Sequence, residues 1–211
     1  MKTKSLKEFF RLLNSEAPTP GGGAVIAYVS ALAVGLTNMS ALISKKRKSF
    51  STLSESVQSQ VNTATEKLTQ YGEEMLDEIQ KDVDGFNCYM EALKLPKESS
   101  QQIKQREEAI NKAAKSSILL PYHVLEICLE AFNEFETILP IVASTIISDL
   151  AIGIILIDAA VESCIVNLKI NLPYIHDTDV IDMVKNKINE ATNVIEYNIR
   201  PLKDRVLLRL N

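Results

Sequence analysis

The sequence has little of what disulfide-rich domains, metal sites and histidine-based catalysts need. Its 211 residues include three cysteines, two histidines and no tryptophan. The cysteines, at positions 88, 128 and 164, are far apart and odd in number, so we expect buried thiols rather than a disulfide framework. Neither His123 nor His176 has a carboxylate or cysteine at metal-ligand spacing. We therefore expect no metal and no histidine-based catalytic triad.

The sequence also has no excess of positive charge. The formal net charge is −4, which argues against a general nucleic-acid-binding protein, since such a protein would have a basic surface. The one basic cluster, Lys45-Lys46-Arg47-Lys48, has two interpretations: a solvated helix end favoured by the helix dipole, or a site for an anionic substrate tail. Residues 1–12 lack the apolar segment and cleavage site of a secretory signal, so a cytoplasmic protein is expected.

Two long segments have almost no charge. Residues 24–43 contain none, and residues 138–157 contain only Asp149. Each is long enough to cross a bilayer, but both include several hydroxyl side chains. A carboxylate also costs about 2.5–3.5 kcal/mol at the bilayer centre on insertion scales. We therefore expect central helices of a protein assembly rather than membrane spans.

Helical periodicity accounts for nearly the whole chain, so we predict an all-α fold with a single domain over residues 1–211. Ser5 and Glu8 form a capping box in front of a short amphipathic helix. The helices expected after it cover residues 24–45, 52–95, 99–135 with a kink at Pro121, 137–172 with Thr137 as its cap, and a last helix from about 177, bent at Pro201.

The predicted helix lengths have a consequence for assembly. A helix of forty residues spans about 60 Å at 1.5 Å per residue, which is long for one compact bundle. Two helices that are apolar nearly all round also present more apolar surface than one chain of this size can bury. We therefore predict a homodimer or a higher homo-oligomer.

Three of the seven glycines stand together, at positions 21–23, after Pro18, Thr19 and Pro20. Glycine permits positive φ and lets a ligand approach the backbone, while the helix that follows presents free N–H groups and a partial positive charge. The segment therefore suits a carboxylate or phosphate, or it is only a tight turn that introduces the helix. It lacks the lysine of a Walker loop and follows no strand, which disfavours nucleotide binding.

Asp149 is an unusual carboxylate because it follows Ser148 within an apolar helical segment. Burial would favour its neutral form and suit it to work as a general acid or base, whereas a buried Lys or Arg partner would make it half of a structural ion pair. Asp82 and Asp84 lie on a helix with a charge every few residues, which usually marks a solvated face.

Several short motifs occur together in an order that resembles one family. The chain shows Pro18-Thr19-Pro20-Gly21-Gly22-Gly23-Ala24, Asp82-Val83-Asp84-Gly85-Phe86, Leu95-Pro96-Lys97, Arg106 with Ala109-Ile110, Pro121, Ser148-Asp149-Leu150, and Asn167-Leu168-Lys169-Ile170-Asn171-Leu172. Together they resemble the C-terminal domain of formiminotransferase-cyclodeaminase and its free-standing relatives, over roughly residues 5–200.

The resemblance implies an all-helical dimer that acts on one-carbon adducts of tetrahydrofolate and uses no metal or redox cofactor. In a cyclodeaminase, N10 attacks the carbon of a 5-formimino group and ammonia leaves. In a cyclohydrolase, water opens the methenyl bridge. The resemblance makes Asp149 and Asp82 candidates for the catalytic acid or base. The candidates for substrate binding are Thr19, Pro20, Gly21, Gly22, Gly23, Ser148, Lys97 and Arg106, the last two together with the basic cluster for the glutamate tail.

Two positions depart from the family pattern. Val142-Ala143 replaces a Gly-Asn pair that the family often has before the Ser-Asp motif, and Gly85 replaces an alanine. The first departure motivates a third hypothesis, a helical folate-binding or scaffold protein that kept the fold without the chemistry.

Overall fold

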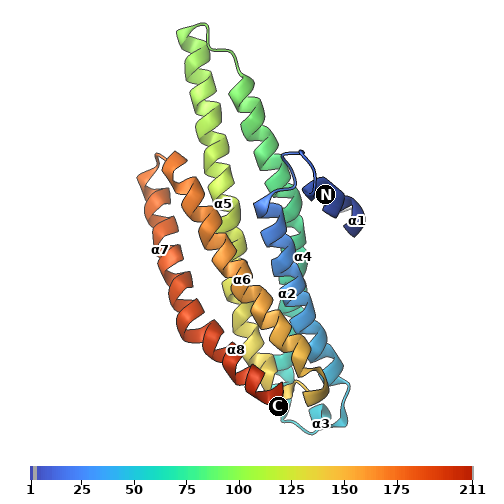
Figure 1. Cartoon of the computed structure of the whole chain (residues 1–211). Helices are drawn as coiled ribbons and strands as arrows, with labels where there is room; N and C mark the ends of the chain where they lie inside the picture. Colours follow the sequence, from blue (N-terminus) through green and yellow to red (C-terminus); the bar gives the residue numbers. More distant parts are fainter. Residues whose placement is uncertain (2–3, 211) are drawn as a thin grey trace.

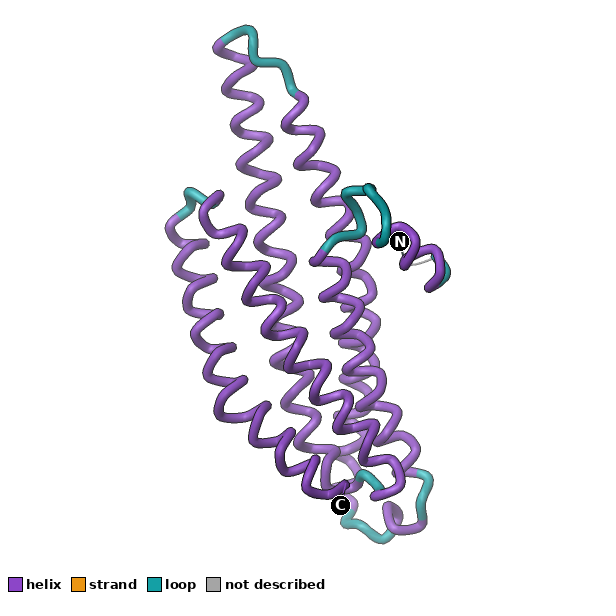
Figure 2. Tube along the Cα trace, viewed as in Figure 1, coloured by secondary structure: helices purple, strands orange, loops and turns teal. Residues whose placement is uncertain are grey.

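The computed structural model describes residues 1 and 4–210, and these form a bundle of helices with no strand among them (Figure 2). This confirms the all-α prediction. The short helix α1 (Leu6–Leu13) begins at the predicted capping box, in which the Ser5 hydroxyl accepts from the Glu8 N–H and the Glu8 carboxylate accepts from the Ser5 N–H. It lies at one side of the bundle (Figure 1), where Phe9 packs against Tyr28 with ring centroids 5.5 Å apart.

Four long helices make up most of the molecule: α2 (Gly22–Lys45), α4 (Glu55–Lys94), α5 (Ser100–Ile138) and α6 (Ile147–Asn171). The four-residue α3 (Lys48–Ser51) connects α2 to α4. The end of α4 and the start of α5 project beyond the other helices as a two-helix arm (Figure 1). The chain therefore has a four-helix core and one uncovered hairpin of helices.

The last helical segment runs back along α6 and bends, as predicted, close to Pro201 (Figure 1). It consists of α7 (Thr178–Val194), a π-helical turn η4 (Ile195–Ile199) and α8 (Arg200–Leu207). Pro201 has no N–H to donate to the preceding turn, and a wider turn accommodates that missing bond. A hydrogen-bonded ion pair of 2.6 Å between Lys203 Nζ and Asp158 Oδ2 joins α8 to α6.

Two predicted boundaries on either side of residue 140 are wrong. Thr137 does not cap a new helix, because α5 continues past it to Ile138. Two 3-10 turns follow, η1 (Leu139–Ile141) and η2 (Ser144–Ile146), and α6 begins only at Ile147. Pro140 supports this break, because it cannot continue the hydrogen bonding of α5. Pro121, in contrast, is accommodated inside α5 without interrupting it.

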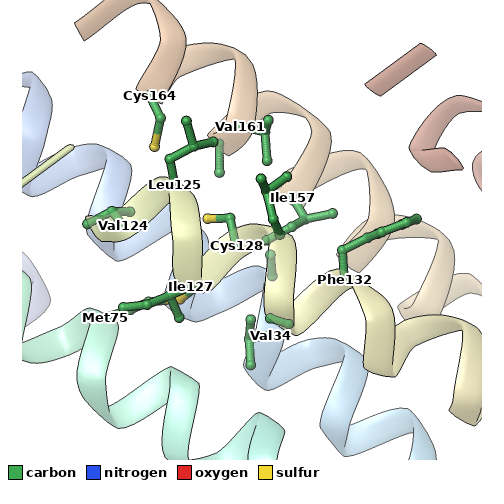
Figure 3. Packing of buried hydrophobic residues seen from close by; sticks show 14 of the residues in the cluster. Val34, Met75, Val124, Leu125, Ile127, Cys128, Phe132, Ile157, Val161 and Cys164 are labelled. Atoms are coloured by element: carbon green, nitrogen blue, oxygen red, sulfur yellow. The ribbon is translucent and has the colours of Figure 1, made fainter. Parts of the chain in front are cut away.

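The core lies where α2, α5 and α6 meet (Figure 3), around Val34, Cys128, Ile157 and Val161. Gly153 lets α6 approach α2 closely, since a Cβ at this position would lie 2.1 Å from Thr37 Oγ1 and 3.1 Å from the Ala33 carbonyl oxygen. All three cysteines are free. Cys128 and Cys164 are buried as predicted, but Cys88 is exposed on α4, so the prediction for that thiol is wrong.

The apolar character of α2 is explained by its central position. Among the described helices, α2 is the one that is long and apolar enough to cross a membrane. However, 56% of its most apolar 18-residue segment is buried inside the protein. A short connection leads into the first turn of α2. The 3-10 turn η3 (Leu172–Tyr174) follows the end of α6, and the 3-10 turn η5 (Leu208–Leu210) ends the described chain. The first turn of α2 and the η3 connection both contribute to the cavity described next.

Candidate functional site

A cavity of about 960 Å³ lies at the root of the two-helix arm. This volume is at the upper end of the range for pockets that hold one small-molecule ligand, about 300–1,000 Å³. Its walls come from the glycine segment at the start of α2, the C-terminal half of α4, the middle of α5, the end of α6 and the connection to α7. The cavity therefore brings together segments from the beginning, middle and end of the chain.

One face of α4 forms a wall of the cavity. Its lining residues are three or four positions apart, which places them in one row on a helix: Glu78, Lys81, Asp82, Gly85, Phe86 and Tyr89. This row combines ionisable groups at one end with aromatic rings at the other. Asp82 was expected on a solvated face, but it is half-buried and turned toward the start of α2.

Asp82 holds the first turn of α2. Its Oδ2 accepts a hydrogen bond of 2.9 Å from the N–H of Ala24, the third residue of that helix. Burial raises the pKa of Asp82 above its ordinary value, and the Ala24 hydrogen bond only partly opposes this. A carboxyl with a raised pKa inside a cavity is a common arrangement for a catalytic acid or base.

The last glycine of the segment fits this contact. A Cβ at Gly23 would lie 2.1 Å from Asp82 Oδ1 and 2.7 Å from its Cγ, so only glycine allows the carboxyl to approach. Positive φ is not the reason for these glycines, because no described residue has one. Gly21 is the N-cap of α2 in an extended conformation, Gly22 opens to the cavity, and Thr19 also lines it. Pro20 is buried and follows a cis peptide bond.

His123, on α5, faces a carboxylate cluster on α4. Its Nε2 lies 3.0 Å from Glu74 Oε1 and 3.8 Å from Glu78 Oε1. Glu78 is almost fully buried and is paired with Lys81 at 2.5 Å. In the sequence His123 is isolated, because these partners are more than forty residues away, and only the packing of α4 against α5 brings them together.

The structure does not bring the two predicted catalytic carboxylates together. Asp149 lies in the first turn of α6, whereas the cavity reaches α6 at Asn167 and Asn171 near its other end. The eighteen residues between Asp149 and Asn167 span about 27 Å of helix. Asp149 is half-buried rather than enclosed by apolar helix, because it lies at a helix N-terminus, where free N–H groups and the dipole favour a carboxylate. Ser148 is exposed beside it.

The predicted anion-binding cations also lie elsewhere. Lys97 is exposed in the connection at the end of the arm, and Arg106 donates to the Leu93 carbonyl oxygen at 3.4 Å, which joins the two helices of the arm. Lys45 Nζ donates to Thr65 Oγ1, and Arg47 donates to Thr145 Oγ1, at the end of α2 opposite the glycine segment. The basic side chains that line the cavity are instead Lys81, His123 and His176.

Comparison with known proteins decides the family. A model of the family described as formiminotransferase-cyclodeaminase matches residues 5–190. The chain belongs to this family. A solved structure of formiminotetrahydrofolate cyclodeaminase from Thermotoga maritima shares its fold, with a TM-score of 0.77, 26% identity, and coverage of 99% of this chain and 96% of that one.

Two relatives represent the two named activities in the formiminotransferase-cyclodeaminase family. Formimidoyltransferase-cyclodeaminase from Gallus gallus is 28% identical over 193 residues, covering 90% of this chain but 35% of the relative. The chain thus spans about a third of that relative's length. Methenyltetrahydrofolate cyclohydrolase from Methylorubrum extorquens is 25% identical over 174 residues, covering 82% of both chains.

The motifs of the formiminotransferase-cyclodeaminase family fall into two groups in space. The glycine segment, the Asp82 motif and the 167–172 motif contribute residues to the cavity. The motif of Arg106 with Ala109-Ile110 contributes only Ile110, and the Leu95-Pro96-Lys97 and Ser148-Asp149 motifs contribute none of their residues. The Val142-Ala143 departure belongs to the second group, because the Ala143 N–H donates to Ser44 Oγ near the far end of α2. The departure therefore leaves the cavity wall intact.

The described part of the chain has no group of three or more His, Cys, Asp or Glu side chains arranged to hold a metal ion. Several ionisable groups near the cavity are paired with each other or with the backbone: Asp82 with Ala24, Glu78 with Lys81, and His123 with Glu74. This arrangement suits proton transfer and the binding of a polar organic molecule.

Proposed function

We propose that the protein is a formiminotetrahydrofolate cyclodeaminase, which converts 5-formiminotetrahydrofolate to 5,10-methenyltetrahydrofolate and ammonia. The observation that carries the proposal is the half-buried Asp82, held by the first turn of α2 inside a cavity large enough for a folate. Membership of the family and the names of its relatives support the substrate class.

In this proposal Asp82 is the base. When N10 attacks the formimino carbon, N10 gains positive charge and becomes acidic, so a carboxylate suffices to remove its proton. Burial raises the pKa of Asp82 and thereby makes its ionised form a stronger base than an exposed aspartate. The reaction is a ring closure with proton transfers and loss of ammonia, and we propose that it needs neither a metal nor a redox cofactor.

The remaining cavity walls suit the rest of a folate. Phe86 and Tyr89 offer flat aromatic surface for the pterin or the aminobenzoyl ring. Asn167 and Asn171 offer amide donors and acceptors, and Asn171 is oriented by its own hydrogen bonds to Asn167 at 2.8 and 2.9 Å. We propose that these amides recognise the polar edge of the pterin.

A second candidate function is methenyltetrahydrofolate cyclohydrolase. It is favoured by the relative from Methylorubrum extorquens, which matches this chain over most of both lengths. Both reactions pass through a tetrahedral carbon between two nitrogens and need protons moved at the same place. The same cavity and the same Asp82 would serve either reaction.

One assay separates these functions. Purified protein is incubated separately with 5-formiminotetrahydrofolate and with 5,10-methenyltetrahydrofolate, and the methenyl absorbance is followed. A cyclodeaminase produces absorbance from the first substrate with release of ammonia, and a cyclohydrolase removes it from the second. Inertness toward both would contradict the enzyme proposal. Calorimetric titration with folinic acid would then show whether the protein is a folate-binding homologue without chemistry.

We also propose that two copies associate through one face of α2 and α6. These two helices pack on each other in the core, yet both expose large apolar side chains on the other side: Leu32 is 46% exposed on α2, and Val166 and Ile170 are each 66% exposed on α6. A second copy with the same face would bury these side chains in a two-fold symmetric interface.

The dimer proposal predicts that Val166→Glu weakens association without unfolding the chain. The side chain is 66% exposed in one copy, so the substitution leaves the core untouched, whereas a two-fold interface would bury two carboxylates. Light scattering should give a dimer for the wild type and a monomer of about 23.4 kDa for the variant. Tyr197→Glu, at a 75% exposed position on η4, is the control and should stay dimeric. A monomeric wild type would contradict the proposal.

A further inference from the structure

The proposed cyclodeaminase reaction requires a second proton transfer that Asp82 does not perform. After N10 bonds to the formimino carbon, the carbon bears N5, N10 and an amino group. The amino group leaves as ammonia only when a proton is added to it, because an amide anion is far too basic to depart. We infer that His123 supplies this proton. The inference rests on the proposed function.

The formimino group enters as its amidinium, N5–CH=NH2+. The N10–carbon bond forms as the π pair of the C=N bond moves onto the terminal nitrogen, which becomes NH2, and the N10 proton goes to the Asp82 carboxylate. The bond from carbon to the departing nitrogen breaks, and its electron pair stays on that nitrogen, which takes a proton from the His123 imidazolium. Ammonia and the cationic 5,10-methenyl bridge remain. No oxidant, reductant or further reactant is needed.

The position of His123 fits an acid held ready by carboxylates. Its side chain is 42% exposed and lines the cavity, while Nε2 lies 3.0 Å from Glu74 Oε1 and 3.8 Å from Glu78 Oε1. A carboxylate that accepts a hydrogen bond from one ring nitrogen orients the imidazole and stabilises the imidazolium. The other ring nitrogen is then the one that can serve a ligand in the cavity.

The neighbouring ionisable groups are less suited to the role. Glu78 has a side chain that is only 2% exposed, and its Oε1 already pairs with Lys81 at 2.5 Å. Lys81 is held by that ion pair at one end of the α4 row. Imidazole is the side chain that both holds and releases a proton near neutral pH, as repeated turnover requires.

His123 and Asp82 line one cavity from two neighbouring helices. On α4, Asp82 is eight residues beyond Glu74 and four beyond Glu78, the two carboxylates near His123 Nε2, or about 12 and 6 Å along the helix axis. A nitrogen–carbon–nitrogen unit with one hydrogen bond at each end requires roughly 6–8 Å. In the proposed complex the reacting group lies between the imidazole and the carboxyl.

The test uses His123→Gln in the full-length protein. Glutamine can still donate an N–H to Glu74 but cannot deliver a proton to a leaving group. We expect kcat for ammonia release to fall ~10²–10⁴-fold while KM stays within about threefold. Glu126→Gln is the matched control, because Glu126 lies one turn farther along α5, with its carboxylate 3.8 Å from Lys187 Nζ. It should keep wild-type kcat, and circular dichroism should show both variants folded.

A second variant separates a chemical from a structural role. His123→Ala should regain activity when imidazole is added to the assay, with a rate that saturates as imidazole fills the vacated space. A wild-type kcat in His123→Gln, a loss confined to KM, or a lost kcat that imidazole does not restore would each overturn the inference. Failure of the proposed function is a separate result, in which the wild type itself releases no ammonia.

Discussion

Replacing Asp82 by asparagine should lower kcat by ~10²–10⁴-fold and leave substrate affinity close to that of the wild type. Asparagine keeps an oxygen that can accept from the Ala24 N–H, so the start of α2 should stay in place, but it cannot take up a proton. Initial rates of ammonia release measure the effect. Asp84→Asn is the control, since Asp84 is exposed, accepts from Gln80 at 2.8 Å and does not line the cavity.

The same variant has an expected signature in stability. Burial raises the pKa of Asp82 in the folded protein, so the ionised form is disfavoured there relative to the unfolded chain. The wild type therefore loses stability as pH rises from the ordinary value of the carboxyl through its raised value, and Asp82→Asn does not. Above that range the variant should melt at a higher temperature than the wild type, because it buries no charge at this position. An active variant with an unchanged melting curve would contradict both the catalytic role and the desolvation of Asp82.

Gly23→Ala should reduce activity by about 10²-fold or more, because a displacement of about 1 Å at a reacting group has effects of that size. The added Cβ would lie 2.1 Å from Asp82 Oδ1, so either the carboxyl or the first turn of α2 must move. The loss should not add to that of Asp82→Asn, since both substitutions disturb one contact. Kinetics of the two single variants and the double variant measure this coupling.

Gly72→Ala is the matched control for Gly23→Ala. It makes the same substitution on α4, outside the cavity, and its Cβ would meet only Val34 Cγ1, at an ordinary 3.9 Å. It should keep full activity and gain a little stability from better helix propensity. Full activity in Gly23→Ala would show that the Asp82 contact with the start of α2 is not needed for turnover.

Local signals in the sequence predicted local structure well. The capping box at Ser5 begins α1 as expected, and the three-four spacing of apolar residues predicted α4 to within a few residues of each end. The start of α6 was misplaced because Thr137 followed by Pro140 is also a reasonable helix N-terminus. Only packing against α2 and α5 shows that residues 139–146 are turns.

The candidate site was predicted in part. The glycine segment and Asp82 were identified through the family resemblance, and the structure places them in contact. The apolar sequence context of Asp149 suggests burial, but its position at a helix N-terminus cannot be deduced when that helix start is misplaced. The sequence does not predict a role for His123, because its partners Glu74 and Glu78 lie on another helix. Such contacts depend on how α4 packs against α5, which spacing within either helix does not reveal.

The position of the cavity relative to α2 bears on how its ligand preferences can change during evolution. Asp82 and the glycine segment are anchored to the largely buried α2, so the end of the cavity that holds the proposed base tolerates little variation. Another wall includes Tyr174 and His176, which are exposed on the short connection between α6 and α7. Substitutions at these two positions should change stability little. Descendants of this chain can therefore acquire new preferences for the outer part of a ligand while they keep the Asp82 end of the cavity.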